Sequence, residues 1–209
     1  MTYIETERER EVRLLYCNLM SETRRRLDFL EVLYENSFKL PLSPRRELGY
    51  LQLRMICETV ALACLVVHGD DLPGMNARIK SAHQADFILK RLEELHPRFF
   101  PEPGTPVPDP AMPDARKFEP STDDYLTKSE LITLYRQCGE HLHRGTYQNI
   151  GEPDETPPPF EPIRDARLRL VMLLRFHRIA LIGTRDELWV HMVHPETSDV
   201  WATLEQPVH

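Results

Sequence analysis

The stretch "MICETVALACLVV", residues 55–67, decides the fold class because apolar residues lie on nearly every side of any helix that it forms. A helix that is hydrophobic all round is buried among other elements. The Ser-Pro pair at 43–44 predicts that this helix begins there, and Gly69 predicts that it ends after His68. We therefore expect a central helix, with Glu58 either at its edge or paired with a buried partner.

Apolar residues at spacings of three and four predict four further helices, which proline and glycine separate. The S/T-x-x-E pattern of Thr127 and Glu130 is a capping box, which marks the start of one of them. The expected helices span residues 7–37, 76–95, 128–144 and 163–182. Two proline-rich segments, 97–122 and 146–162, lack backbone donors and are predicted to be loops.

The pattern changes to strand only after residue 185. The segments "ELWVHMVH" and "VWATLEQ" alternate between apolar and polar residues around "PETSD", which predicts a β-hairpin over 187–206. Together these elements predict a mainly α fold in one domain, residues 1–209. It is a bundle of about five helices with a C-terminal β-hairpin.

Charge and composition narrow the possible partners. The formal net charge of -7 repels nucleic acid and anionic membranes, so binding to either requires a local basic patch. The acidic start has no signal-peptide pattern, and the longest apolar run is far shorter than the roughly 20 residues of a membrane span. We predict a cytoplasmic protein without membrane attachment. No C-x-x-C pair occurs, so the four cysteines are expected to be reduced thiols: Cys17, Cys57, Cys64 and Cys138.

The stretch "ITLYRQCGEHLHRG", residues 132–145, carries the candidate catalytic residues. At about 100° per helical residue, positions seven apart nearly eclipse, so Arg136 and His143 share one face and His141 points away. An H-x-H pair on a helix diverges by roughly 200°, and no zinc-type spacing occurs elsewhere in the sequence. We therefore predict no metal site and no cofactor.

This run resembles the R-x4-6-H motif of the HEPN superfamily, as R-x6-H to His143 and as R-x4-H to His141. HEPN domains are compact, usually dimeric helical bundles. Many are metal-independent RNA-cleaving toxins or antiphage effectors, and others are non-catalytic binding modules. The resemblance implies a homodimer in which Arg136 and His143 act on RNA. Gln137 stands where active members often have Asn, Asp or His, so the resemblance supports the fold more than catalysis.

Longer segments resemble a bacterial family of helical proteins of similar length. They are "YLQLRMICETVALACLVVHGD", "LHPRFFP", "LTKSELITLYRQCGEHLHRG" and the terminal hairpin. This likeness covers most of the chain and implies no chemistry.

The Arg136–His143 pair has two interpretations. Histidine can transfer the 2′-hydroxyl proton near neutral pH, and arginine can grip the phosphate in bidentate fashion. Alternatively, His143 and Arg144 complement the macrodipole at a helix C-terminus and cap its carbonyls, which requires no function.

A basic stripe on the last predicted helix offers a second nucleic-acid feature. Its arginines fall within about 80° of one another by helical geometry: Arg164, Arg167, Arg175 and Arg178. With Arg144 they are candidate RNA contacts, or else a solvated face paired with acids of the N-terminal helix. The sequence thus leaves two functions open. One is a helical interaction or regulatory module that binds RNA or nucleotide phosphate, and the other is a metal-independent endoribonuclease.

Overall fold

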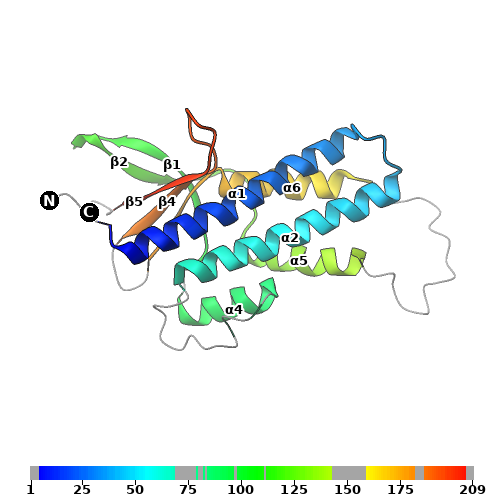
Figure 1. The fold of residues 1–209 in the computed structure, drawn as a ribbon, viewed down its shortest axis with the longest axis horizontal. Coiled ribbons are helices and arrows are strands. Elements are labelled where there is room, and N and C mark those ends of the chain that lie inside the picture. The colour runs from blue at the N-terminus through cyan, green and yellow to red at the C-terminus, as the bar shows by residue number, and fades with distance from the viewer. Residues whose placement is uncertain are drawn as a thin grey trace.

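The computed structural model describes residues 5–68, 79, 82, 84–96, 98–110, 112–142, 159–181 and 186–205, with the backbone alone for 112–115. A helical bundle carries an antiparallel sheet at one end (Figure 1). The helices are α1 (Glu7–Glu35), α2 (Leu42–His68), α4 (Ala85–Leu95), α5 (Lys128–Leu142) and α6 (Glu161–Leu174). The strands are β1 (Glu102–Asp109), β2 (Met112–Pro120), β3 (Phe176–Ala180), β4 (Glu187–His191) and β5 (Trp201–Glu205).

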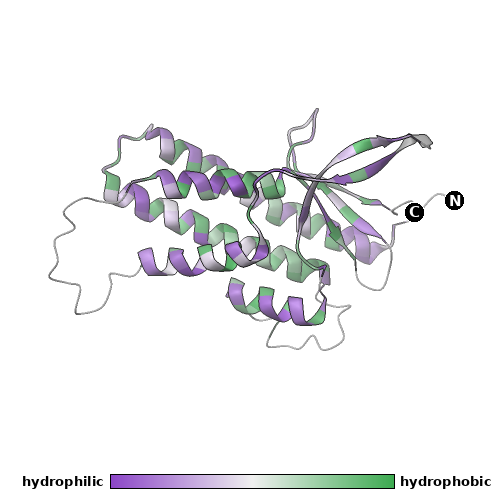
Figure 2. Cartoon of the chain, turned by 180° about the vertical axis from the view of Figure 1, so that it is seen from behind, coloured by the Kyte–Doolittle hydropathy of each residue, from purple (hydrophilic) through white to green (hydrophobic). Residues whose placement is uncertain are grey.

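Helix α2 lies in the middle of the bundle and packs against α1, α4, α5 and α6, which confirms the predicted central helix. Glu58 lies at its edge, where its carboxylate is 3.3 Å from the guanidinium of Arg54. By length and composition α2 alone among the described helices is apolar enough to cross a membrane. Most of its apolar stretch is buried inside the fold, as in the core helix of a soluble protein. The outer helices alternate between hydrophobic and hydrophilic residues along their length (Figure 2).

Capping residues define the helix ends that the sequence predicted best. At the start of α5, the Thr127 backbone N–H donates to Glu130 at 2.9 Å, and the Glu130 N–H donates to the Thr127 hydroxyl at 3.4 Å. This is the predicted capping box. Thr6 and Glu9 form a second one at the start of α1, which ends at Asn36 in the left-handed conformation. Helix α4 begins only at Ala85, and most of the predicted 76–84 portion lies outside the described residues.

The prediction of a proline-rich loop over 97–122 was wrong, because this segment forms strands β1 and β2. Within the described residues the sheet has five strands in the order β2-β1-β3-β4-β5. Strand β1 pairs with β3 only through Glu102 and Pro103, and its remainder pairs with β2 alone. Pro106 and Pro108 are two residues apart, so their nitrogens point toward the same edge of β1. Proline is tolerated there because an open edge needs no donor.

The prediction that the last helix continues to residue 182 was also wrong. Helix α6 ends at Leu174, and the chain turns at Arg175 into strand β3. A short apolar run fits a buried strand as well as a buried helix, so periodicity did not separate the two. The strand prediction after residue 185 therefore missed three of the five strands that the structure describes.

The two strands predicted after residue 185 pair in antiparallel fashion as β4 and β5, but the predicted separate hairpin was wrong, because β4 also pairs with β3 and the two strands form one edge of the five-stranded sheet. Trp201 lies opposite His191 and stacks on its ring at 4.3 Å between centroids. Trp189 packs edge-on against Phe176 at 5.8 Å and is buried. Both tryptophans therefore serve packing within the sheet.

Candidate functional site

Arg136, one of the two predicted catalytic residues, lies on α5 with 51% of its side chain exposed. Its Nη2 atom is 3.5 Å from Oδ2 of Asp86, at the start of α4. Within the described residues this is the one ion pair of Arg136, and at 3.5 Å it only partly offsets the charge of the half-exposed guanidinium. His143 and Arg144 lie outside the described residues, so their geometry relative to Arg136 stays a prediction.

His141, the alternative histidine of the motif, lies against α2. Its ring stacks on Tyr50 with centroids 4.0 Å apart and planes inclined by 17°. The guanidinium of Arg46 lies 5.7 Å from the centre of the same tyrosine ring. Burial and the nearby Arg46 cation lower the pKa of His141. The neutral form of the His141 imidazole is therefore favoured, beside the permanent positive charge of Arg46.

The middle of the motif serves packing. The Arg54 guanidinium lies 4.6 Å from the centre of the Tyr135 ring and donates to its hydroxyl at 3.0 Å. Gly139 gives this guanidinium room, since a Cβ atom there would lie 3.0 Å from Nη1 of Arg54. Cys138 is buried, and burial raises the pKa of its thiol to about 12. Such a thiol is not a nucleophile near neutral pH.

Three arginines of the predicted basic stripe are paired with acids. Arg167 lies 2.8 Å from Glu31 on α1, which is the pairing with the N-terminal helix that the sequence suggested. Arg175 and Arg178 follow the end of α6, so they do not continue a helical face. Arg175 pairs with Asp123, and Arg178 pairs with Glu102 and Glu187.

Arg164, the fourth arginine of the stripe, belongs to a different cluster. Its guanidinium lies 4.6 Å from the centre of the Tyr34 ring. The Tyr34 ring is 6.3 Å from that of Phe160, over which Arg45 lies at 4.9 Å. In the described part of the chain, Arg45, Arg46 and Arg164 form no ion pair. We call these three arginines and His141 the arginine end.

The arginine end lies where α2 and α6 begin and α5 ends (Figure 1). Gly49 allows the first turn of α6 to close on α2, because a Cβ atom at this position would lie 2.9 Å from Ile163 and 3.3 Å from Phe160. This approach puts Phe160 beneath Arg45, one turn before Gly49. The N-termini of α2 and α6 carry partial positive charge and the C-terminus of α5 carries partial negative charge, so the positive charge of this end comes mainly from its arginines.

The sequence interpretation missed Arg45 and Arg46. The signal was present in "SPRRELGY", where two arginines follow a helix-starting Ser-Pro and precede a glycine and a tyrosine by one turn. Among the described residues, the buried Nε atoms of both arginines have no hydrogen-bond partner.

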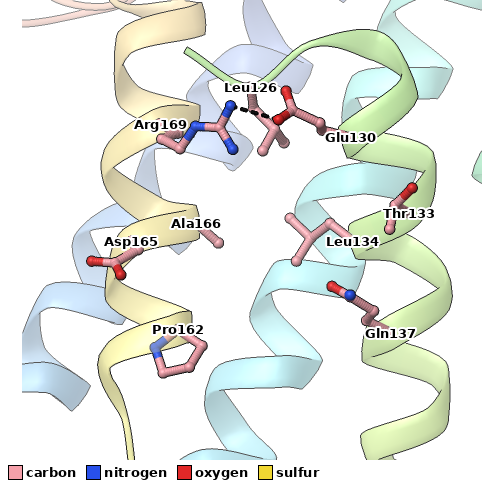
Figure 3. Close-up of a pocket in the computed structure, with 9 residues that line it drawn as sticks. All are labelled: Leu126, Glu130, Thr133, Leu134, Gln137, Pro162, Asp165, Ala166 and Arg169. Carbon is pink, nitrogen blue, oxygen red and sulfur yellow. Dashed lines mark hydrogen bonds and ion pairs between the residues drawn. The ribbon is translucent and has the colours of Figure 1, made fainter. Parts of the chain in front are cut away.

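A pocket of about 300 Å³ lies between α5 and α6, with α2 behind it (Figure 3). Arg169 closes one end of it by donating to Glu130 at 2.8 Å. Leu134 and Ala166 face each other across the middle, and Gln137 points into the gap from α5 (Figure 3). The Thr127 cap and Arg169 lower the pKa of Glu130 to about 2. With no histidine or cysteine in its lining, the pocket lacks an acid–base group that titrates near neutral pH.

Over the described ranges, no group of three or more His, Cys, Asp or Glu side chains is arranged to hold a metal ion. No protein-family model, curated protein or solved structure matches the chain. The candidate sites therefore rest on the geometry of this chain.

Proposed function

We propose that the protein is a non-catalytic, HEPN-like helical module that binds RNA or nucleotide phosphate at the arginine end. One observation supports this proposal. Arg45, Arg46 and Arg164 each lie over an aromatic ring without an acidic partner among the described residues, whereas the other stripe arginines are paired.

Electrostatics favours this location over the rest of the surface. The net charge of -7 makes the average field repel polyanions, so an anionic ligand is drawn to a local excess of positive charge. Each contact of a cation with a ring contributes about 0.5–1 kcal/mol at exposed sites. It also holds the side chain in place, which lowers the entropy cost of binding. The assembly we propose is a cytoplasmic homodimer.

Binding of a labelled single-stranded RNA, followed by fluorescence anisotropy in EDTA, tests the proposal. We expect Arg45→Gln, Arg46→Gln and Arg164→Gln each to weaken binding, and the triple variant to abolish it. If three phosphates are contacted, the slope of log K against log salt should be about -2.

Arg175→Gln is the matched control. It removes the same charge from an exposed arginine that is already paired with Asp123. Equal weakening by Arg175→Gln and Arg46→Gln would show that net charge alone governs binding. Absence of RNA binding by the wild-type protein would contradict the proposal.

The second candidate function is a metal-independent endoribonuclease that uses Arg136 and His143. The exposure of Arg136 and its long 3.5 Å contact with Asp86 favour this alternative, because a phosphate can displace such a contact. The control is Arg91, a partly exposed arginine of α4 that pairs with Glu94 of the same helix. In EDTA, RNA cleavage that is lost in Arg136→Ala and His143→Ala but kept in Arg91→Ala would support the nuclease. Light scattering that shows a monomer would remove the version with a site shared between subunits.

A further inference from the structure

The pocket between α5 and α6 combines apolar walls with one free amide. Its volume is about 300 Å³, and Leu134 and Ala166 face each other across it (Figure 3). The Gln137 side chain points into the gap and forms no hydrogen bond within the described part of the chain. Asp165 also lines the pocket and is exposed to solvent. Apolar walls with a few polar groups are typical of small-molecule sites, so the pocket can hold a flat ring that hydrogen-bonds to Gln137.

The two ends of the pocket differ in charge. At one end lies the carboxylate of Glu130, to which Arg169 donates at 2.8 Å. The other end leads to the arginine end, because Gln137 and His141 are four residues apart and lie on one face of α5. His141 is exposed and stacks on the same tyrosine ring that carries Arg46. The anionic group of a ligand is therefore favoured beside His141 and disfavoured beside the acids of the lining.

We infer that the pocket and the arginine end together bind one nucleoside monophosphate unit, either free or as the terminal nucleotide of an RNA. This inference rests on the proposed function and names its ligand. The base occupies the pocket against Leu134 and Ala166, and the phosphate lies at Arg46 and His141. One helical turn, roughly 5–6 Å between Cβ atoms, separates Gln137 from His141, and a ribose spans a similar gap between base and phosphate. Glutamine reads adenine through paired hydrogen bonds, so adenosine monophosphate is the matching probe.

Calorimetric titration of the full chain with adenosine monophosphate and with ribose 5-phosphate tests the inference, because the second probe lacks the base. We expect adenosine monophosphate to bind about tenfold more tightly or better, since its base adds buried apolar area and hydrogen bonds. Ala166→Leu fills the pocket and should remove this difference, and Gln137→Ala should reduce it. Arg46→Gln should weaken both ligands. Asn18→Ala, which removes an exposed amide on α1, is the control, and thermal melts check that each variant is folded.

Two RNA probes of equal length separate the two sources of the nucleotide. One is a linear oligoadenylate with a 5′-phosphate, and the other is a circular oligoadenylate without ends. Binding of the linear strand alone supports the inference with an RNA end as the ligand. Binding of adenosine monophosphate without either strand supports it with the free nucleotide as the ligand.

The outcomes also separate the inference from the proposed function. Equal affinities for adenosine monophosphate and ribose 5-phosphate would overturn the inference, and the proposed phosphate binding would stand. RNA binding that is weakened in Arg46→Gln but unchanged in Ala166→Leu would have the same meaning. If neither the small phosphates nor the RNA probes bind, both fail.

Discussion

The hydroxyl of Tyr16 lies 2.7 Å from Nε2 of His177, a contact that spans 161 residues of the chain and joins α1 to β3. Both side chains are fully buried. The Nδ1 atom of His177 lies 2.8 Å from the Leu174 carbonyl oxygen, which can only accept a hydrogen bond. Nδ1 therefore carries the proton, and Nε2 accepts from the tyrosine. The pair fixes the sheet on the bundle.

Replacing Tyr16 by Phe should lower the free energy of unfolding by about 1–3 kcal/mol, because Nε2 of His177 is left buried without a donor. Urea unfolding measures this change. Tyr34→Phe is the control, since the Tyr34 hydroxyl forms no hydrogen bond within the described residues and its loss should change little. Equal stabilities of Tyr16→Phe and wild type would show that the bond contributes nothing net.

Acid should destabilise the protein through two buried histidines. Burial lowers the pKa of both His68 and His177 to about 4, whereas unfolded histidine titrates near 6.5. Below 6.5 the unfolded state takes up protons that the folded state excludes. The free energy of unfolding therefore decreases as the pH is lowered from about 6.5 to about 4, where both states are protonated. The loss is on the order of 3 kcal/mol per histidine. Urea midpoints across this range should follow that course, and a flat profile would contradict it.

Gly104→Ala should destabilise the hairpin of β1 and β2. A Cβ atom at this position would lie 2.5 Å from the backbone oxygen of Glu119 and against the ring of Phe118. Relieving such overpacking costs about 1–3 kcal/mol. Gly139→Ala is the comparison, because its Cβ atom meets only the flexible end of Arg54 and alanine favours the helix by about 1 kcal/mol. In thermal melts, the Tm of Gly104→Ala should lie well below that of Gly139→Ala.

The four cysteines of the folded protein should react only slowly with the thiol reagent DTNB. All four are buried, and burial raises the pKa of each thiol. Slow labelling of the folded protein, followed by rapid reaction of all four thiols in denaturant, is the expected result. A Leu15→Cys variant provides the positive control, because Leu15 is 46% exposed. Fast labelling of the folded wild type would show that at least one of the four thiols is accessible, which would contradict this prediction.

Phosphate binding at the arginine end should strengthen as pH falls. Burial and Arg46 lower the pKa of His141 in the free protein, and a bound anion raises it by favouring the imidazolium. Ligand binding is therefore coupled to proton uptake, so affinity increases below the ordinary histidine range. His141→Gln should flatten this dependence while keeping the arginine contacts. An affinity that is unchanged between neutral and acidic pH in the wild type would place His141 outside the site.

Local signals predicted the helices well because their determinants lie close together in sequence. The Thr127–Glu130 capping box and the all-round apolar character of α2 both act within a few turns. The pairing of β4 with β5 could also be predicted from the sequence, since one short turn segment separates the two strands.

Non-local pairing explains what the sequence did not reveal. Strand β1 owes its place to the pairing of Glu102 with Arg178, and no pattern within β1 indicates that partner. The arginine end likewise depends on Gly49, which brings Phe160 to Arg45 across the bundle. Residues such as Arg167, whose partner Glu31 is distant in sequence, are indistinguishable from free cations until the helices are packed.

The bond between Tyr16 and His177 also sets an order of events during synthesis. At roughly 5–20 residues per second, the ribosome makes His177 about 10–30 s after Tyr16. The contacts between α1 and α2 can form early, because these helices are neighbours in the chain. The part of α1 that carries Tyr16 gains its partner only when β3 emerges. Docking of the sheet on α1 is therefore expected to follow the packing of α1 against α2 during synthesis.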